Sequence, residues 1–197
     1  MLRAFIFILF YIFIHNNSFS NVNREDIINY LEGFSSLESD FIQINNNGDI
    51  LSGKILVLRP GKFRIEYNQI PLLIISNRKK VAVINKQLKS IIFHALDDIP
   101  VGVLLFNKLS MRDIKILKLI EKENRVSIDV VDSNFKDQGF VEILFETNPF
   151  NMRKWTIFKN DDSKTEVFFN NLVLNKKLLP KLFDIEKEDP RKIPWKN

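Results

Sequence analysis

Between residues 38 and 170, apolar and polar residues alternate with a period of two, and this pattern constrains the fold more than any other feature of the sequence. A period of two places successive side chains on opposite faces of a β-strand. The segments that follow it are joined by short stretches typical of turns, rich in Asn, Asp, Gly, Lys or Pro. They are residues 38–45, 50–58, 62–67, 71–76, 80–85, 88–94, 112–121, 125–132, 139–146, 153–159 and 165–170. We therefore predict a mainly β protein, built as a meander of antiparallel strands rather than from alternating βαβ units.

Two segments depart from this alternation, and each predicts a short helix. In the first, Asn23 and the acidic residues after it provide a cap and a first turn, and Gly33 is expected to end the helix. Its apolar stripe is Ile27, Ile28, Leu31 and Phe34. The second begins at Pro100, a favourable first residue for a helix, and is too apolar to face water. Its apolar residues include Val101, Leu104 and Leu105.

Residues 1–20 have the pattern of a secretory signal peptide. Arg3 is followed by an uninterrupted apolar run over residues 4–14, which is shorter than the roughly 20 residues of a membrane-spanning helix. Ser18 and Ser20 are small residues suited to a cleavage site after Ser20. We predict that residues 1–20 are removed on export to the periplasm and that residues 21–197 form a single domain. The alternative is an N-terminal anchor that is retained.

The composition excludes several classes of catalytic site. The chain has no cysteine and two histidines, of which His15 lies in the predicted signal peptide. Zinc sites of Cys and His and thiol nucleophiles are therefore excluded. The remaining His94 is expected at the surface near a strand end, and no Gly-x-Ser-x-Gly nucleophile elbow is present. We predict no catalytic residues, no metal and no cofactor, and thus a protein that is not an enzyme.

Binding of nucleotides and nucleic acids is also disfavoured. Residues 48–54 match the spacing of a phosphate-binding loop, but Ile55 stands where a Ser or Thr should bind magnesium. Residues 45–49 are better interpreted as a hairpin turn. The net charge of +5 is modest, and the basic residues lack the interleaved aromatic residues of a nucleic-acid platform.

Arg59 is the residue whose expected direction contradicts its chemistry. Phe63, Ile65 and Tyr67 form the apolar face of their strand, and Ile55 and Val57 have the same parity in the preceding strand. If this parity continues to the turn at residues 60–61, Arg59 points toward the apolar face. A guanidinium group in that position is costly unless it is hydrogen-bonded.

Taken in order along the chain, these residues resemble the LolA family of periplasmic outer-membrane lipoprotein carriers. The resemblance covers nearly the whole chain and is most specific at residues 59–64, Arg-Pro-Gly-Lys-Phe-Arg. It also includes Phe41 with Gln43, the apolar segment at residues 100–106, Trp155 and the Phe-Phe-Asn at residues 168–170. Departures occur at Asn77-Arg78, where members often have Asp-Gly, and near residues 84–85.

The resemblance implies an open, curved antiparallel sheet, an unclosed barrel of about eleven strands, with a lid of short helices over its concave apolar face. It implies that Arg59 hydrogen-bonds carbonyl groups of the lid and holds the empty carrier closed. The residues implied to line the acyl-chain cavity are Ile55, Val57, Phe63, Ile65 and Tyr67. Those implied in the lid are Ile27, Leu31, Phe34, Val101, Leu104 and Leu105. The implied partners are lipoproteins, an inner-membrane ABC transporter of the LolCDE type near Phe63, and an outer-membrane receptor or the outer membrane itself, with the carrier acting as a monomer.

Two alternatives remain open at the level of sequence. The same apolar residues could form an ordinary core under the helices, because a close-packed core and a roomy cavity use the same side chains. The same fold also serves envelope sensors and glycolipid-binding proteins, so the fold alone does not select transport.

Overall fold

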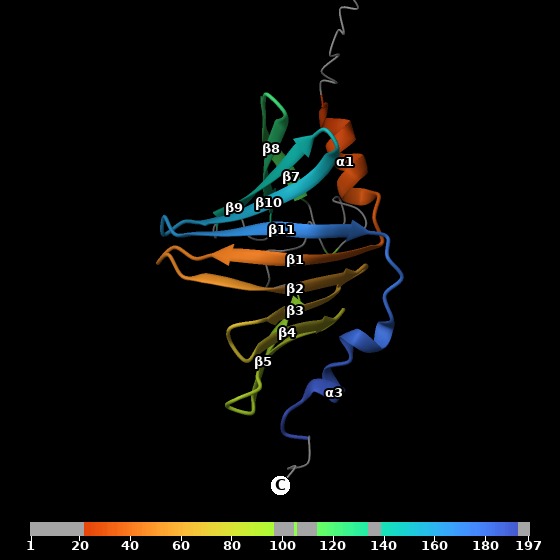
Figure 1. Ribbon diagram of the computed structural model, residues 1–197, viewed down its shortest axis with the longest axis vertical. Coiled ribbons are helices and arrows are strands. Elements are labelled where there is room, and N and C mark those ends of the chain that lie inside the picture. Colours follow the sequence, from red (N-terminus) through yellow and green to blue (C-terminus); the bar gives the residue numbers. More distant parts are fainter. Residues whose placement is uncertain (1–21, 97–104, 106–113, 134–138, 193–197) are drawn as a thin grey trace, which may run out of the picture.

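The computed structural model describes residues 22–96, 105, 114–133 and 139–192, and within them the chain forms one eleven-stranded antiparallel sheet with a few short helices (Figure 1). The strands are β1 (Ser36–Ile44), β2 (Ile50–Leu58), β3 (Lys62–Tyr67), β4 (Leu72–Asn77), β5 (Lys80–Asn85), β6 (Ser90–Ala95), β7 (Ile114–Lys122), β8 (Arg125–Asp132), β9 (Gly139–Thr147), β10 (Phe150–Lys159) and β11 (Lys164–Leu174). Every predicted strand is present, and the predicted bounds of β2, β3, β5 and β8 are those observed. The mainly β prediction is confirmed.

The other strands differ from the prediction mainly at their ends. β1 begins two residues early, at Ser36, where Ser36 and Leu37 are both buried. β10 begins at Phe150 and β11 continues to Leu174, well beyond the predicted limits. The β1–β11 and β10–β9 pairs each contain a register shift, and strand pairing continues on both sides of it. The apolar–polar alternation of the sequence is interrupted at such a shift, so it did not predict the full length of these strands. The predicted start of β7 at Arg112 lies outside the described residues.

The first helix, α1 (Arg24–Glu32), follows the sequence signals closely. The Asn23 side chain accepts a hydrogen bond from the Asp26 backbone N–H, and the Asp26 carboxylate accepts one from the Asn23 backbone N–H, which forms a capping box. Ile27 and Leu31 are fully buried. The placement of Phe34 in this helix was wrong, because α1 ends before Gly33 and Phe34 lies beyond it. Of the second predicted helix only Leu105 is described, with helical backbone and a buried side chain; Val101 and Leu104 lie outside the described residues.

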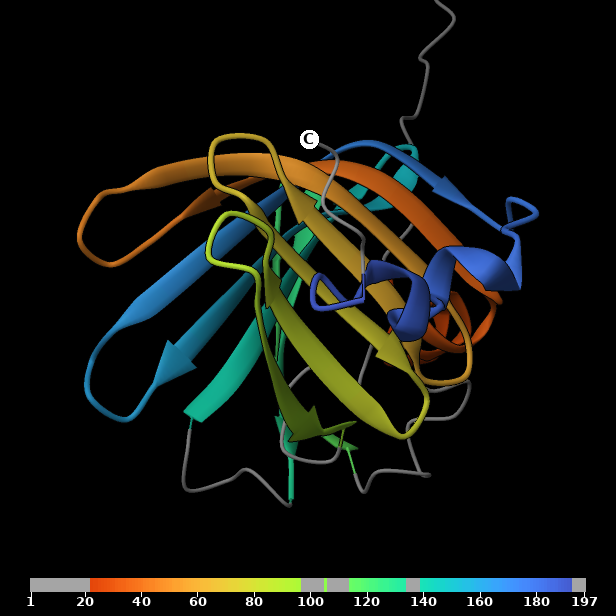
Figure 2. The same ribbon diagram turned by 90° about the horizontal axis from the view of Figure 1, so that it is seen from below.

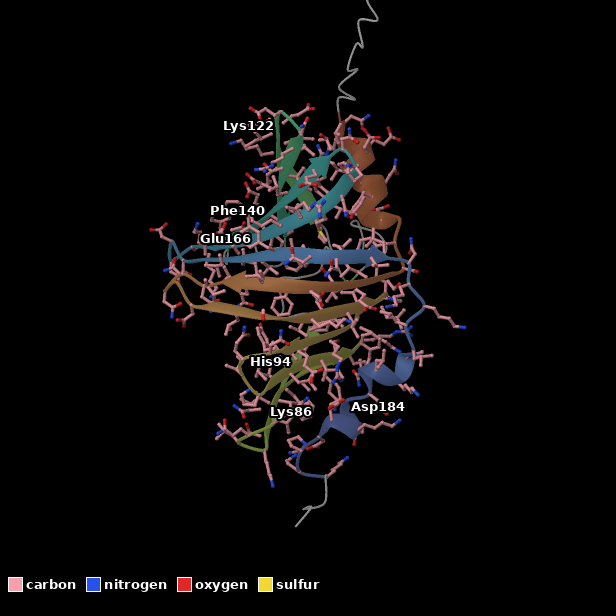
Figure 3. All side chains as sticks on the ribbon, in the orientation of Figure 1. Lys86, His94, Lys122, Phe140, Glu166 and Asp184 are labelled. Atoms are coloured by element: carbon pink, nitrogen blue, oxygen red, sulfur yellow. The ribbon has the colours of Figure 1, made fainter. Side chains whose placement is uncertain are left out.

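The sheet is open rather than closed into a barrel. Its strand order is β6-β5-β4-β3-β2-β1-β11-β10-β9-β8-β7, so β6 and β7 are the two edges. The pairing of β1 with β11 joins the first part of the meander to the last. In Figure 3, Lys122 at the end of β7 lies near the top of the molecule and His94 of β6 in the lower half.

Helix α1 covers the concave face of the sheet over β9 and β10. The Tyr30 hydroxyl donates to Asn151 Oδ1 at 2.7 Å and accepts from the Met152 backbone N–H at 3.1 Å. The Tyr30 ring makes edge-to-face contacts with Phe145 and Phe150 at centroid distances of 5.4 and 5.3 Å. We call this region the filled half of the concave face. Its inward-facing sheet residues are Val126, Ile128, Val130, Val141, Ile143, Phe145 and Met152, all buried.

A C-terminal segment covers part of the convex face. It contains η3 (Pro180–Phe183) and α3 (Ile185–Glu188), which contact β3 and β4 (Figure 2). Ile185 completes a second apolar cluster with Leu73, Ile75, Ala82 and Ile84 of β4 and β5. Arg64 of β3 pairs with Glu188 at 2.8 Å. No sequence pattern predicts these elements, since helices of four residues are too short to show a helical period.

The hairpin turn predicted at residues 45–49 is confirmed. The Gly48 N–H donates to the Asn45 carbonyl at 2.9 Å, and Gly48 has a φ of +86°, which favours glycine. Lys54 lies within β2, so these glycines do not open a helix as a phosphate-binding loop would. Among the described residues, no helix has the length and apolar character needed to cross a membrane.

Candidate functional site

The part of the concave face that α1 leaves uncovered contains an apolar cavity of about 400 Å³. We call this region the hollow half. It is lined by Phe41, Gln43, Ile55, Val57, Phe63, Ile65, Tyr67, Ile74, Val83, His94, Leu105, Trp155, Ile157, Thr165, Val167 and Phe169. Apart from Leu105, these residues come from β1 to β6, β10 and β11, so strands far apart in the sequence build one site. A cavity of this kind, apolar with a few polar groups, is the usual form of a small-molecule or lipid site.

The structure brings all five residues named for the cavity into its lining: Ile55, Val57, Phe63, Ile65 and Tyr67. Their shared direction follows from the β2–β3 register, in which Ile55 pairs with Ile65 and Val57 with Phe63. Ile65 and Tyr67 are only partly buried, because the cavity leaves space beside them.

The sequence pattern gave no cavity role to the lining residues of β10 and β11, among them Trp155 and Ile157. The signal was available, since extending the apolar parity to every strand selects Trp155, Ile157, Val167 and Phe169 as one face. His94 is exposed on β6, as expected, and it also lines the cavity. Parity alone did not show which part of that face would be hollow.

Gly53 lets two aromatic residues meet across the floor of the cavity. It pairs with Phe41 on one side and Tyr67 on the other. A Cβ at Gly53 would lie 2.8 Å from the Phe41 ring and 2.1 Å from the Glu66 carbonyl oxygen. Without it, the Phe41 and Tyr67 rings make an edge-to-face contact at 5.4 Å.

Arg59 lies at the border between the filled and hollow halves, and it is buried with only 6% of its surface exposed. Its Nη1 donates to the carbonyl oxygens of Leu31 at 2.6 Å and Phe34 at 3.2 Å. Its guanidinium carbon lies 3.5 Å from the centroid of the Phe34 ring. The prediction that Arg59 points inward is confirmed, and its side chain ties β2 to the end of α1.

Burial also changes the electrostatics of Arg59. Loss of solvation lowers the pKa of its guanidinium to about 10, and the nearby Glu32 carboxylate acts in the opposite direction. The group therefore stays charged at neutral pH inside an apolar region. A buried charge of this kind is stable only while its hydrogen bonds are kept, so the end of α1 and Arg59 depend on each other.

The turn that follows Arg59 contacts Leu105, the one described residue of the second predicted lid helix. The Gly61 N–H donates to the Leu105 carbonyl at 2.8 Å. The Gly61 carbonyl accepts from the Arg78 N–H at 3.1 Å and from the Ser76 hydroxyl at 2.8 Å. Gly61 has a φ of +70°, and a Cβ there would approach the Arg78 Cα to 3.3 Å. Residues 59–61 thus hold both α1 and Leu105 against the sheet.

The chemistry available in the cavity is that of binding. Its walls are mostly hydrocarbon, and burial raises the pKa of the Tyr67 hydroxyl, which therefore stays protonated at neutral pH. In the part of the chain that the structure describes, no three His, Cys, Asp or Glu side chains gather where they could hold a metal ion.

Comparison with known proteins supports the same family that the sequence resembles. The family model described as outer membrane lipoprotein carrier protein LolA matches residues 32–186. Among curated proteins, an uncharacterized protein of Rickettsia prowazekii (strain Madrid E), RP864, is 25% identical over 151 residues, covering 76% of this chain and 70% of that protein.

Solved structures with a similar fold are more distant in sequence. An uncharacterized conserved protein from Thermus thermophilus has a TM-score of 0.50 at 8% identity, covering 87% of this chain and 93% of that one. A DUF1329 family protein from Desulfovibrio piger ATCC 29098 has a TM-score of 0.51 at 9% identity, covering 82% and 94%. At these identities the two structures support the fold alone.

Proposed function

This chain belongs to the LolA family, and from that premise we propose that it carries lipoproteins through the periplasm with their acyl chains shielded in the cavity. The observation that carries the proposal is an apolar cavity next to a helix that a buried arginine holds in place. Export by the signal peptide expected at residues 1–20 would bring the protein to the periplasm.

The energetics of lipid binding explain why such a carrier needs interactions that hold its empty state closed. We call the Arg59 hydrogen bonds to Leu31 and Phe34 the latch. Burying one methylene group gains about 0.8 kcal/mol, so several long acyl chains in a rigid pocket would bind too tightly to be released. Interactions that stabilise the empty, closed state lower the net affinity, because they must be broken on loading. The bonds from Arg59 to Leu31 and Phe34 are such interactions, since they join the sheet to α1.

Loading requires the closed state to open. A cavity of about 400 Å³ is at the lower end of the range of about 300–1,000 Å³ for ligand pockets. A lipoprotein that brings several acyl chains needs more room than this. The contacts proposed to break on loading are those of residues 59–61 with the end of α1 and with Leu105.

The proposed partners follow from the cargo. Lipoproteins would be received from an inner-membrane ABC transporter of the LolCDE type and delivered to an outer-membrane receptor or to the outer membrane itself. The carrier is proposed to act as a monomer. Phe63, in the cavity wall four residues after Arg59, is expected near the contact with the transporter.

The experiment is a release assay with inner-membrane vesicles that contain a labelled lipoprotein, the transporter and ATP. Mature protein, without residues 1–20, should produce a soluble one-to-one complex. The Arg59→Leu variant should accept cargo but deliver it poorly to acceptor membranes, because the closed state no longer competes with the loaded one.

A matched control removes an arginine whose side-chain partner is on the sheet and not on α1. Arg153 pairs with Glu146 at 2.6 Å, and Arg153→Leu should transfer cargo like the parent. Equal transfer by Arg59→Leu and the parent would reject the latch. Failure to form a lipoprotein complex, together with direct binding of free glycolipid, would instead favour the sensor or glycolipid-binding alternative.

A further inference from the structure

Among the described residues, one hydrogen-bond donor in the cavity lining has no acceptor. Trp155, on β10, lines the cavity and is 5% exposed, and its indole Nε1 is buried without a hydrogen-bond partner in the described part of the chain. A buried tryptophan N–H usually finds a partner, because an unsatisfied donor loses its bond to water without replacement. An exception of this kind requires an explanation.

Other polar groups lie near Trp155 at the same end of the cavity. Trp155 pairs with Val167, and Val167 pairs with Gln43, so Trp155 and Gln43 flank one residue in a single cross-strand row. The Tyr67 hydroxyl donates to Gln43 Oε1 at 3.0 Å, and Gln43 Nε2 donates to Asn45 Oδ1 at 2.7 Å. Thr165, also in the lining, pairs with Ile157 two residues beyond Trp155 on β10.

This end of the cavity lies away from the latch. Arg59 follows the end of β2, whereas Gln43 pairs with Leu51 near the start of the same strand. Between them, Ile55, Val57 and Phe63 present only hydrocarbon to the cavity. The end toward Leu105 and Arg59 has one polar lining side chain among the described residues, His94, which lies in the cross-strand row of Phe63. The polar side chains at the other end, which we call the polar end, are Gln43, Thr165 and Trp155.

An indole N–H is a donor only, so the group that satisfies it must be an acceptor. An acyl chain has no acceptor along its length, but it has one at its head, the carbonyl oxygen of the ester or amide that attaches it. The cavity adjoins the Trp155 side chain, so a group bound in it lies beside the indole.

We infer that the polar end of the cavity is a subsite for the acyl carbonyl group of the cargo, with Trp155 Nε1 as its donor. The inference rests on the proposed lipid-carrying function, and it specifies the orientation of the bound lipid in the cavity. The acyl chains run toward Phe63 and Leu105, and the glyceride or amide head stays at the strand ends near Gln43 and Thr165. Trp155 distinguishes an acylated glyceride from a simple hydrocarbon of the same length.

The test compares two lipids that differ only in the carbonyl groups. Dipalmitoyl glycerol and its dihexadecyl ether analogue compete with a fluorescent hydrocarbon probe bound to the mature protein. One net hydrogen bond corresponds to a preference of about twofold to about tenfold, and the parent should prefer the ester by this amount. Trp155→Phe keeps an aromatic ring but removes the donor. For this variant, the ratio of the affinity for the ester to that for the ether should fall to about one.

Thr156→Val is the matched control. Thr156 is the next residue on β10, its hydroxyl is likewise buried without a partner among the described residues, and alternation places it on the opposite face of the sheet. This variant should keep the preference for the ester.

Fluorescence adds a second readout. Trp155 and Trp195 are the only tryptophans of the sequence, so a Trp195→Phe background leaves Trp155 as the only indole. Its emission should shift with the ester and not with the ether.

The outcomes separate the two claims. The subsite would be overturned if the parent showed no preference for the ester over the ether, a result that requires no variant. It would also be overturned if the preference persisted in Trp155→Phe. In both cases the hydrocarbon probe still binds and the carrier proposal stands. If neither the probe nor either lipid binds, the lipid-carrying function itself fails, and the subsite with it.

Discussion

The two halves of the concave face have similar residues, but only the hollow half encloses a cavity. In the filled half, Ile128, Ile143, Phe145 and Met152 are fully buried under α1. In the hollow half, Val57 and Phe63 are also buried, but Ile65 and Val167 are only partly buried and border the cavity. Both halves belong to the same apolar, concave face of one antiparallel sheet.

The comparison teaches that a cavity here is made by what covers a strand and not by the strand itself. Helix α1 presents Ile27, Leu31 and Tyr30 to the filled half, and their side chains fill the space above the sheet. At the border of the hollow half, residues 59–61 make hydrogen bonds to the end of α1 and to Leu105. The filled half thus supplies stability, and the hollow half supplies room for a ligand.

The largest expected difference between the halves is in stability after truncation. Ile143→Ala in the filled half should lower the free energy of unfolding by about 2–5 kcal/mol, since it creates a void in a packed core. Ile65→Ala in the hollow half should cost about 1 kcal/mol, because its side chain already borders the cavity. Urea unfolding of both variants measures the difference. Equal losses would mean that the hollow half is packed as a core in solution.

Enlarging a side chain should have opposite consequences in the two halves. Val141→Phe in the filled half should destabilise by about 1–3 kcal/mol through overpacking. Val167→Phe should leave stability unchanged or raise it slightly, because the ring enters the cavity. The same variant should weaken binding of a hydrocarbon probe by about tenfold or more, which corresponds to about 1.4 kcal/mol. Undiminished binding by Val167→Phe would place the ligand elsewhere.

Arg59 connects the halves, and its removal should loosen α1 more than the sheet. Arg59→Leu leaves the carbonyls of Leu31 and Phe34 without this donor, and an unsatisfied buried group costs about 1–3 kcal/mol. Amide hydrogen exchange in the last turn of α1 should therefore become about tenfold faster or more. Exchange in β8 and β9 should change little. A uniform increase over the whole sheet would indicate general destabilisation and not release of a lid.

The smallest effect concerns two tyrosines, one in each half. The sequence has three tyrosines, and Tyr11 lies in the predicted signal peptide, so the mature protein would hold only Tyr30 and Tyr67. Burial raises the pKa of both hydroxyls above the usual value of about 10. The stability gained from the neutral phenols is therefore present below about pH 10 and lost as the pH rises through the raised values.

Filling the cavity with a hydrocarbon probe should raise the pKa of Tyr67 further and leave that of Tyr30 unchanged. Ultraviolet titration of the parent, Tyr30→Phe and Tyr67→Phe, each with and without probe, assigns the two values. A shift at Tyr30, or none at Tyr67, would mean that the probe does not enter the hollow half.

The sequence predicted the strands well because period-two alternation and turn residues are local signals. It predicted the direction of Arg59 because parity in β2 and β3 is unbroken up to the turn. It placed Phe34 in the helix because helical spacing continues past Gly33, where the chain in fact turns toward β1. The roles implied for Arg59 and the cavity residues came from the family resemblance and remain predictions.

What the sequence could not predict depends on contacts between distant segments. The division into filled and hollow halves depends on where α1 lies over β9 and β10, and no local pattern encodes that position. The polar end of the cavity depends on the β1–β11 and β10–β11 registers, which bring Gln43 and Trp155 onto either side of Val167. The sequence did not predict η3 and α3, because each has four residues and depends on packing against β4. Such short helices have no recognisable apolar period.

The most direct test of the central claim uses unmodified mature protein and a lipoprotein whose acyl chain carries a photoactivatable group. After illumination of the soluble complex, mass spectrometry locates the attachment points on the carrier. Adducts on the hollow half, at residues such as Phe63, Ile65 and Val167, are the expected result. Adducts confined to α1 or to the β8 and β9 residues of the filled half would contradict the claim that the hollow half holds the acyl chains.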